Sequence, residues 1–240
     1  MRRRSTIRVQ SAAQISETPS ANQDPETLKS KLMEILGTTD GNMTDESKAI
    51  IESLEQANPV AAPASKPDLY DGHFQLLNST MQGVLYRGAF ITLGRATFNA
   101  FQPSSLQIQM HEVYNDVGVR EPDAYDLALE FTIAQEGVPP LEGVIVNNAR
   151  FEQEGSDRLS IVFLRSTLRP RNPERDLDAW LKIFKDSSIG MDEQGTFQKS
   201  LPPAKGWLDI TYLDKDMRIT RGNHGAVVVV KKLEKPAIVF

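Results

Sequence analysis

Between residues 84 and 232 the chain repeats one pattern, a short run of alternating apolar and polar residues followed by a turn. In the clearest run, Leu127, Leu129 and Phe131 alternate with residues that include Glu130 and Thr132. A period of two is typical of a half-buried β-strand. Comparable segments lie at residues 84–93, 96–101, 106–110, 125–133 and 159–163, and residues 141–147 and 149–153 form one further strand with an irregularity at Asn147-Asn148. Strands at this spacing favour a β-sandwich or barrel over βαβ units.

The stretch 206–225 predicts two more strands joined by a turn. Apolar residues recur at every second position from 208 to 212 and again at 217 and 219, and an acidic turn at 214–216 separates them. Gly222 and Gly225 allow positive φ angles, so the chain can reverse around Asn223. A last strand is predicted at 226–232.

Two amphipathic helices are predicted before the strands. Asp24-Pro25 has residues favoured at a helix start, and Asn58-Pro59 stops the second helix. The polar face of each helix carries residues of both charges, whereas helices that lie on membranes are usually rich in Lys and Arg on that face. Packing on the main domain is therefore favoured over membrane anchoring. The apolar stripes consist of Leu28, Leu32, Ile35 and Leu36, and of Ile50, Ile51, Leu54 and Ala57. A later helix at 176–185 has Leu177, Trp180, Leu181 and Phe184 on one face.

Composition excludes several classes of function. The chain of 240 residues carries a net charge of −5, which argues against non-specific nucleic-acid binding. It has no cysteine, so disulfides and thiolate metal sites are excluded. No run approaches the roughly 18 apolar residues of a spanning helix. Residues 1–22 are rich in Arg and Ser before the first acid, Glu17, and are typical of either a transit peptide or a disordered tail.

No arrangement of residues indicates an active site, so we predict no catalytic residue, metal or cofactor. His73, His111 and His224 are far apart in sequence and lack metal-ligand spacing. Asp209 is a strand residue and Asp214 lies beside a turn, which makes a cation site improbable. The arginines at positions 165, 169, 171 and 175 form either a solvated loop or a contact for anionic lipid head groups.

One sequence motif resembles a known family. The arrangement Tyr-Leu-Asp-x-x-Met-Arg-Ile-Thr-Arg-Gly at residues 212–222 is similar to the C-terminal signature of the plastid lipid-associated proteins, the fibrillins. The helical hairpin followed by Asn58-Pro59 resembles the start of the same domain. Fibrillins and lipocalins usually have Gly-x-Trp on the first strand, where this chain has Gly72-His73-Phe74. The structural signature is therefore expected at Gly72, Phe74, Tyr212, Asp214, Arg218, Arg221 and Gly222.

The resemblance implies a mainly β protein, a lipocalin-like antiparallel barrel behind an N-terminal helical hairpin. The expected divisions are a transit-peptide-like segment at 1–22, the hairpin and linker at 23–67, the barrel at 68–235 and a tail at 236–240. In the barrel, Phe74 would close one end, with Arg221, or as the weaker alternative Arg218, stacked over its ring. Gly72 and Gly222 would be backbone positions, where alanine should lower stability if φ is positive.

The resemblance also implies a location in the plastid (chloroplast), at plastoglobules or at the thylakoid and stroma. It implies non-enzymatic binding or organisation of apolar lipids, such as isoprenoid quinones, carotenoids or acyl lipids. Two alternatives remain open, both with a filled barrel: a structural coat on the lipid surface, and a docking module for an enzyme of prenyl-lipid metabolism.

Whether the barrel holds a ligand is not decided by the residue pattern, because about eight strands can enclose either packed side chains or one small ligand. The pattern alone favours a filled core. If a cavity exists, its expected lining consists of Phe90, Phe98, Phe101, Leu106, Ile108, Met110, Leu127, Leu129, Phe131, Ile161, Phe163 and Tyr212.

Overall fold

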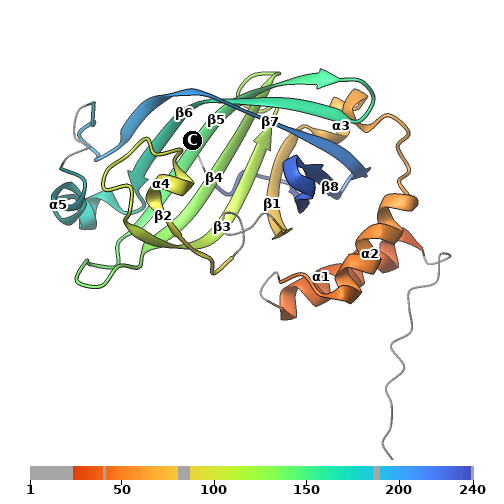
Figure 1. Cartoon of the computed structure of the whole chain (residues 1–240), viewed down its shortest axis with the longest axis horizontal. Coiled ribbons are helices and arrows are strands. Elements are labelled where there is room, and N and C mark those ends of the chain that lie inside the picture. The colour runs from red at the N-terminus through yellow and green to blue at the C-terminus, as the bar shows by residue number, and fades with distance from the viewer. Residues whose placement is uncertain (1–23, 40–41, 81–86, 186–189, 239–240) are drawn as a thin grey trace, which may run out of the picture.

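Antiparallel strands form one sheet that closes on itself (Figure 1). The computed structural model describes residues 24–39, 42–80, 87–185 and 190–238. The strands are β1 (Gly72–Ser79), β2 (Phe90–Thr92), β3 (Gln107–Val117), β4 (Ala124–Ile133), β5 (Glu142–Glu154), β6 (Arg158–Pro170), β7 (Phe197–Leu213), β8 (Met217–Gly222) and β9 (Val227–Leu233). The helices are α1 (Pro25–Thr38), α2 (Asp45–Gln56), η1 (Pro63–Ser65), α3 (Pro67–Tyr70), α4 (Leu93–Ala96), α5 (Pro173–Ile183) and η3 (Asn223–Gly225).

Closure depends on the length of β3. The second half of this strand pairs with β1, in the register Gly72 with Val117, while its first half pairs with β2. The remaining order, β1-β9-β8-β7-β6-β5-β4-β3, completes an eight-stranded antiparallel barrel. Register shifts interrupt several of these pairs, and such bulges bend strands and raise their twist. The predicted mainly β, barrel-type fold is confirmed.

Most predicted strands form, with two differences. The strand predicted over 141–153 with an Asn-Asn irregularity is confirmed as β5, whose pairing with β6 shifts between Asn148 and Ala149. The strand expected at 208–212 is the end of the longer β7, in which Pro202 and Pro203 fall where the pairing with β6 is irregular. Proline lacks the N–H that a regular ladder needs, and this obscured the strand. Of the strand expected at 84–93, only the end forms β2, while positions 84–86 lie outside the described residues.

The strand predicted at 96–101 is wrong. The chain there forms the end of α4 and a turn, in which Phe98 and Asn99 have φ angles of 54° and 59°. Residues other than glycine seldom occupy this left-handed region, although asparagine enters it more readily than most. The apolar residues of this segment therefore have the spacing of a strand, although the backbone that carries them forms a tight turn.

The two N-terminal helices form the predicted hairpin and pack against the outside of the barrel. The Asp24 side chain accepts the N–H of Thr27, and Thr44 and Ser47 cap α2 reciprocally. Six apolar side chains are buried against Tyr212, Met217, Ile219, Val227 and Val229 of β7 to β9, and they are Leu28, Leu32, Leu36, Ile50, Ile51 and Leu54. The hairpin thus covers the barrel wall with its apolar stripe, and packing rather than membrane anchoring accounts for that stripe.

Side chains inside the barrel fall into two groups. Around α5, Trp180 and Phe184 close one part of the barrel and pack with Phe131 and Phe197 in a dense cluster. The helix begins at Pro173, three residues earlier than predicted. The second group centres on Tyr70, Phe151 and other residues near α3. Ile238, expected in a tail, packs outside the barrel on Ala128, Val144 and Val146.

Candidate functional site: an apolar cavity with a charged floor

The closed end of the barrel is built around Phe74. The guanidinium carbon of Arg218 lies 4.4 Å from the centre of the Phe74 ring, and the Lys232 ammonium lies 5.6 Å from it. Arg218 is only 2% exposed. Its guanidinium also donates to the Tyr70 carbonyl at 3.5 Å and to the Asn115 side-chain oxygen. The aromatic plug with a stacked arginine therefore exists.

The partner of Phe74 is Arg218, and the preference for Arg221 is wrong. Arg221 instead donates to both carboxylate oxygens of Glu55 on α2, at 2.8 and 2.7 Å, and ties the hairpin to the barrel. Alternation along β8 explains the choice, because Met217 and Ile219 pack under the hairpin and Arg218 occupies the opposite face. The alternation is visible in the sequence, but which of the two faces the hairpin covers is not.

The glycines of the signature differ in conformation. Gly72 has a φ of 125° at the start of β1. Gly222 has a φ of −106°, so the condition under which alanine would lower stability is not met there. The reversal around Asn223 uses Gly225 instead, whose φ is 73°.

Electrostatics at the floor are dominated by burial. Burial lowers the pKa of the Arg218 guanidinium, although nearby Tyr125 and Asp71 act in the opposite direction. Burial raises the pKa of the Asp71 carboxyl, against the influence of Lys232 and Arg218. Burial likewise raises the pKa of the Tyr125 hydroxyl. The floor therefore combines cations with a carboxylate whose charge is disfavoured.

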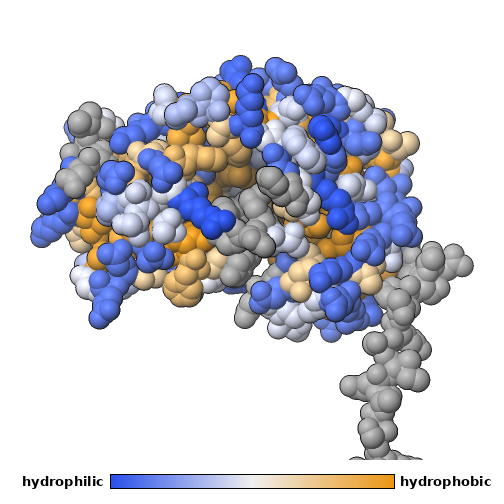
Figure 2. All heavy atoms as spheres, viewed as in Figure 1, coloured by the Kyte–Doolittle hydropathy of each residue, from blue (hydrophilic) through white to orange (hydrophobic). Residues whose placement is uncertain are grey.

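Above this floor lies a cavity of about 230 Å³. Polar groups of Asn115, Arg218, Thr220, Asn223 and Lys205 contribute to its wall. Its other side chains are Leu76, Val113, Tyr125, Leu127, Ile161, Phe163, Trp207, Leu208, Ala226, Val228 and Val230. Figure 2 shows the face on which α4 lies, where hydrophobic residues are exposed among the polar ones beside α4.

Three of the twelve predicted lining residues, Leu127, Ile161 and Phe163, line this cavity. Phe98 is 40% exposed and its ring lies 5.0 Å from that of Phe163, next to the cavity wall. Phe90 is 64% exposed and thus points away from the interior. The other predicted residues of this group, Phe101, Leu106, Ile108, Met110, Leu129 and Phe131, are buried in the filled part of the barrel.

The twelfth, Tyr212, lies outside the lumen, so its assignment to the lining is corrected. Its ring packs under the hairpin and its hydroxyl donates to Asp214 at 2.7 Å. Asp214 also accepts from the Lys29 ammonium at 2.6 Å and from the backbone N–H groups of Asp216 and Met217. This part of the signature therefore fixes the β7–β8 turn and holds α1.

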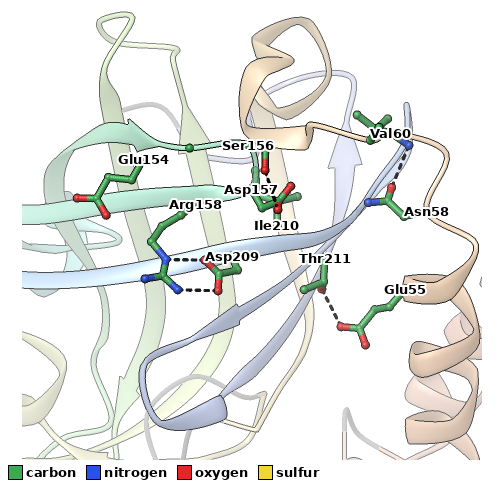
Figure 3. Close-up of a pocket in the computed structure, with 12 residues that line it drawn as sticks. Glu55, Asn58, Val60, Glu154, Ser156, Asp157, Arg158, Asp209, Ile210 and Thr211 are labelled. Carbon is green, nitrogen blue, oxygen red and sulfur yellow. Dashed lines mark hydrogen bonds and ion pairs between the residues drawn. The ribbon is translucent and has the colours of Figure 1, made fainter.

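A second hollow, of about 680 Å³, lies between the end of α2 and strands β6 and β7 (Figure 3). Its walls are largely polar. Arg158 makes a two-pronged ion pair with Asp209 at 2.6 and 2.9 Å, and Thr211 donates to Glu55 at 2.7 Å. Because Glu55 of α2 bonds here to Thr211 of β7, this groove is the seam between hairpin and barrel.

The remaining residues considered for chemistry are dispersed. The Nδ1 atom of His73 lies 3.0 Å from an Asp116 oxygen, and His111 bonds to the Thr132 hydroxyl. Within the described ranges, no group of three or more His, Cys, Asp or Glu side chains is placed to hold a metal ion. The arginine patch divides: Arg171 pairs with Glu130 and Arg175 with Asp176, while Arg165 and Arg169 border an outer groove.

A closed eight-stranded barrel with a plugged end and a small apolar lumen defines a lipocalin-like barrel protein. The sequence profile of the PAP_fibrillin family matches residues 26–231, which is most of the described chain. The chain belongs to this family.

Individual relatives are distant. The chain is 24% identical to plastoglobulin-1, chloroplastic, of Pisum sativum over 78% of its own length and 54% of the relative. It is 24% identical to plastid lipid-associated protein 3, chloroplastic, of Brassica campestris, over 76% of its own length and 52% of the relative. It thus spans about half the length of these two relatives. The plastid-lipid-associated protein of Citrus unshiu is 26% identical, over 92% of this chain and 72% of the relative.

No solved structure gives a significant match to the chain. Across the described residues, none of the helices has both the length and the apolar character needed to cross a bilayer.

Proposed function

We propose that this protein binds an apolar lipid in the barrel cavity, without catalysing a reaction on it. The observation that carries the proposal is the cavity of about 230 Å³ in a barrel whose interior is otherwise filled around α5. Transfer of apolar surface from water to such a wall contributes about 25 cal/mol per Å². An isoprenoid or acyl chain has the required chemistry.

The proposal extends to location. Relatives carry the names plastoglobulin and plastid lipid-associated protein, each described as chloroplastic. These names support a role in the plastid, at the surface of plastoglobules or thylakoids, where the protein exchanges lipid with a reservoir. An enzyme of prenyl-lipid metabolism is a further proposed partner, without an assigned surface.

The size of the cavity limits what it encloses. Pockets that surround a drug-sized ligand measure about 300–1,000 Å³, whereas this one measures about 230 Å³. A long isoprenoid or acyl chain would therefore insert one end and leave the rest outside the mouth. Partial insertion suits a protein that works at a lipid surface.

A cavity-filling variant tests the proposal. Val228 lines the cavity from β9, so Val228→Phe would occupy the lumen. Leu164→Phe is the matched control, because Leu164 is 39% exposed. Binding of 1-hexadecanol, followed by calorimetry and by native mass spectrometry, should be retained in the control and reduced at least tenfold in Val228→Phe.

Two results would reject lumen binding. If the unmodified protein binds no 1-hexadecanol or isoprenoid quinone at one per chain but still floats with oil droplets, the function is that of a surface coat. If Val228→Phe binds as well as the control, the lipid occupies another site.

A further inference from the structure

The floor of the cavity contains a buried cation that forms no ion pair with any of the described residues. Arg218 is 2% exposed and lines the cavity. Arginine has five N–H donors, and in the parts of the chain that the structure describes the Arg218 Nε–H has no acceptor. The two hydrogen bonds of the guanidinium go to neutral oxygens, those of Tyr70 and Asn115.

Protein groups compensate this charge weakly. Asp71 acts on the guanidinium through space, without an ion pair between them in the described structure. Burial raises the pKa of that carboxyl, which weakens its negative charge. Lys232, over the other part of the Phe74 ring, adds a second cation. Buried charges are normally paired and hydrogen-bonded, because an unpaired one is costly.

A second polar group faces the same space. Tyr125 is 8% exposed and lines the cavity, and the charge of Arg218 acts on its hydroxyl through space. A buried tyrosine hydroxyl normally has a partner. The floor therefore has two donors, the Arg218 Nε–H and the Tyr125 hydroxyl, that a ligand can satisfy.

The wall between floor and mouth is mostly apolar. Arg218, Thr220 and Gly222 follow one another on the inner face of β8, and all three line the cavity. Four residues of a strand cover about 13 Å. Over this distance the cavity runs from the floor at Arg218 to the mouth, which Ala226 and Trp207 border.

From this arrangement we infer that the cavity selects lipids by their head group, binding a long-chain carboxylate with its oxygens at Arg218 and Tyr125 and its tail toward the mouth. The inference rests on the proposed lumen binding and adds a ligand class and an orientation. A carboxylate accepts hydrogen bonds from both groups and supplies the missing negative charge. A neutral head group can accept the hydrogen bonds but supplies no negative charge.

A series of three probes with the same tail tests the inference: hexadecanoate, 1-hexadecanol and hexadecyltrimethylammonium. Calorimetry on the full chain at pH 8 should give binding about tenfold or more tighter for hexadecanoate than for the alcohol, and weakest binding for the cation. In Arg218→Met, hexadecanoate and the alcohol should bind alike. Tyr125→Phe should weaken hexadecanoate binding about two- to tenfold.

Lys205 provides the control, since it is a second cationic residue that lines the cavity, from β7 rather than beside Phe74. Lys205→Met should keep the preference for hexadecanoate. If this variant loses the preference, the carboxylate lies at Lys205 and the inference is wrong. The comparison of probes on the unmodified protein, together with Tyr125→Phe, decides the matter even if Arg218→Met does not fold.

Failure of the inference and failure of the proposed function are distinguishable. Equal binding of hexadecanoate and 1-hexadecanol overturns head-group selection but leaves lumen binding intact. No binding of any of the three probes overturns both.

Discussion

At the scale of single residues, the contact between Phe74 and Arg218 gives the first prediction. Phe74→Leu keeps an apolar side chain at the closed end but removes the ring over which Arg218 lies at 4.4 Å. We expect it to lower the free energy of unfolding by about 1–3 kcal/mol, from the lost cation–π contact and the imperfect packing. Urea denaturation measures this. Phe90→Leu, at a 64% exposed position, should change stability by less than about 0.5 kcal/mol, and an equal effect of both would contradict the plug.

Asp214 gives a pH-dependent prediction. Burial alone would raise the pKa of its carboxyl, but hydrogen bonds from Lys29, Tyr212 and two backbone N–H groups lower it. The ionised carboxylate therefore stabilises the fold above its ordinary pKa of about 3.9, and this contribution is lost as the pH falls through the lowered value. Asp214→Asn should cost about 2–4 kcal/mol at pH 7.

The measurement for Asp214 is the difference in unfolding free energy between the unmodified protein and Asp214→Asn, from pH 7 down to pH 3. The difference should shrink toward the acid end of this range. Asp178→Asn, at an exposed position on α5, serves as the control. A difference that stays constant across the range would show that the charge of Asp214 does not act on stability.

At the scale of elements, the hairpin is predicted to be an integral part of the fold. Leu32 of α1 is fully buried against the barrel wall, whereas its neighbour Met33 is 43% exposed. Leu32→Ala should lower the free energy of unfolding by about 2–5 kcal/mol, because it removes buried apolar contacts and leaves a void. Met33→Ala should cost less than about 1 kcal/mol. Equal, small effects in urea denaturation would mean that the hairpin contributes nothing to the stability of the barrel.

Elements were predictable where one physical rule governs them. Alternation identified β4 and the β8 strand, and capping residues located α1 and α2, because these depend on local spacing. The turn at Phe98 and Asn99 was predicted as a strand because its apolar residues have the spacing of a strand. Its φ angles of 54° and 59° depend on tertiary packing, which the spacing does not reveal. The identity of the stacked arginine required knowing which face of β8 the hairpin covers, a long-range contact.

At the scale of the whole molecule, the barrel is divided into a filled and a hollow part. Alternation told which side chains face inward but not how far the lumen is filled, because that depends on α5 covering one region with Trp180 and Phe184. Most of the predicted lining belongs to the filled part for this reason. The deep polar floor was also hidden, since Asn115 and Tyr125 come from strands far from Arg218 in sequence.

Two leucines on one strand test this division. Leu127 and Leu129 of β4 share the inner face, but Leu127 lines the cavity while Leu129 is 1% exposed in the filled cluster. Leu129→Ala should lower the free energy of unfolding by about 2–5 kcal/mol, because a dense core leaves a void at the deleted side chain. Leu127→Ala should cost less, about 1–2 kcal/mol, because its side chain already borders empty space and makes fewer contacts. Guanidinium denaturation of both variants measures the contrast. Equal losses would mean that the lumen is packed as densely as the α5 end, and ligand binding would then have to be sought on the outer surface.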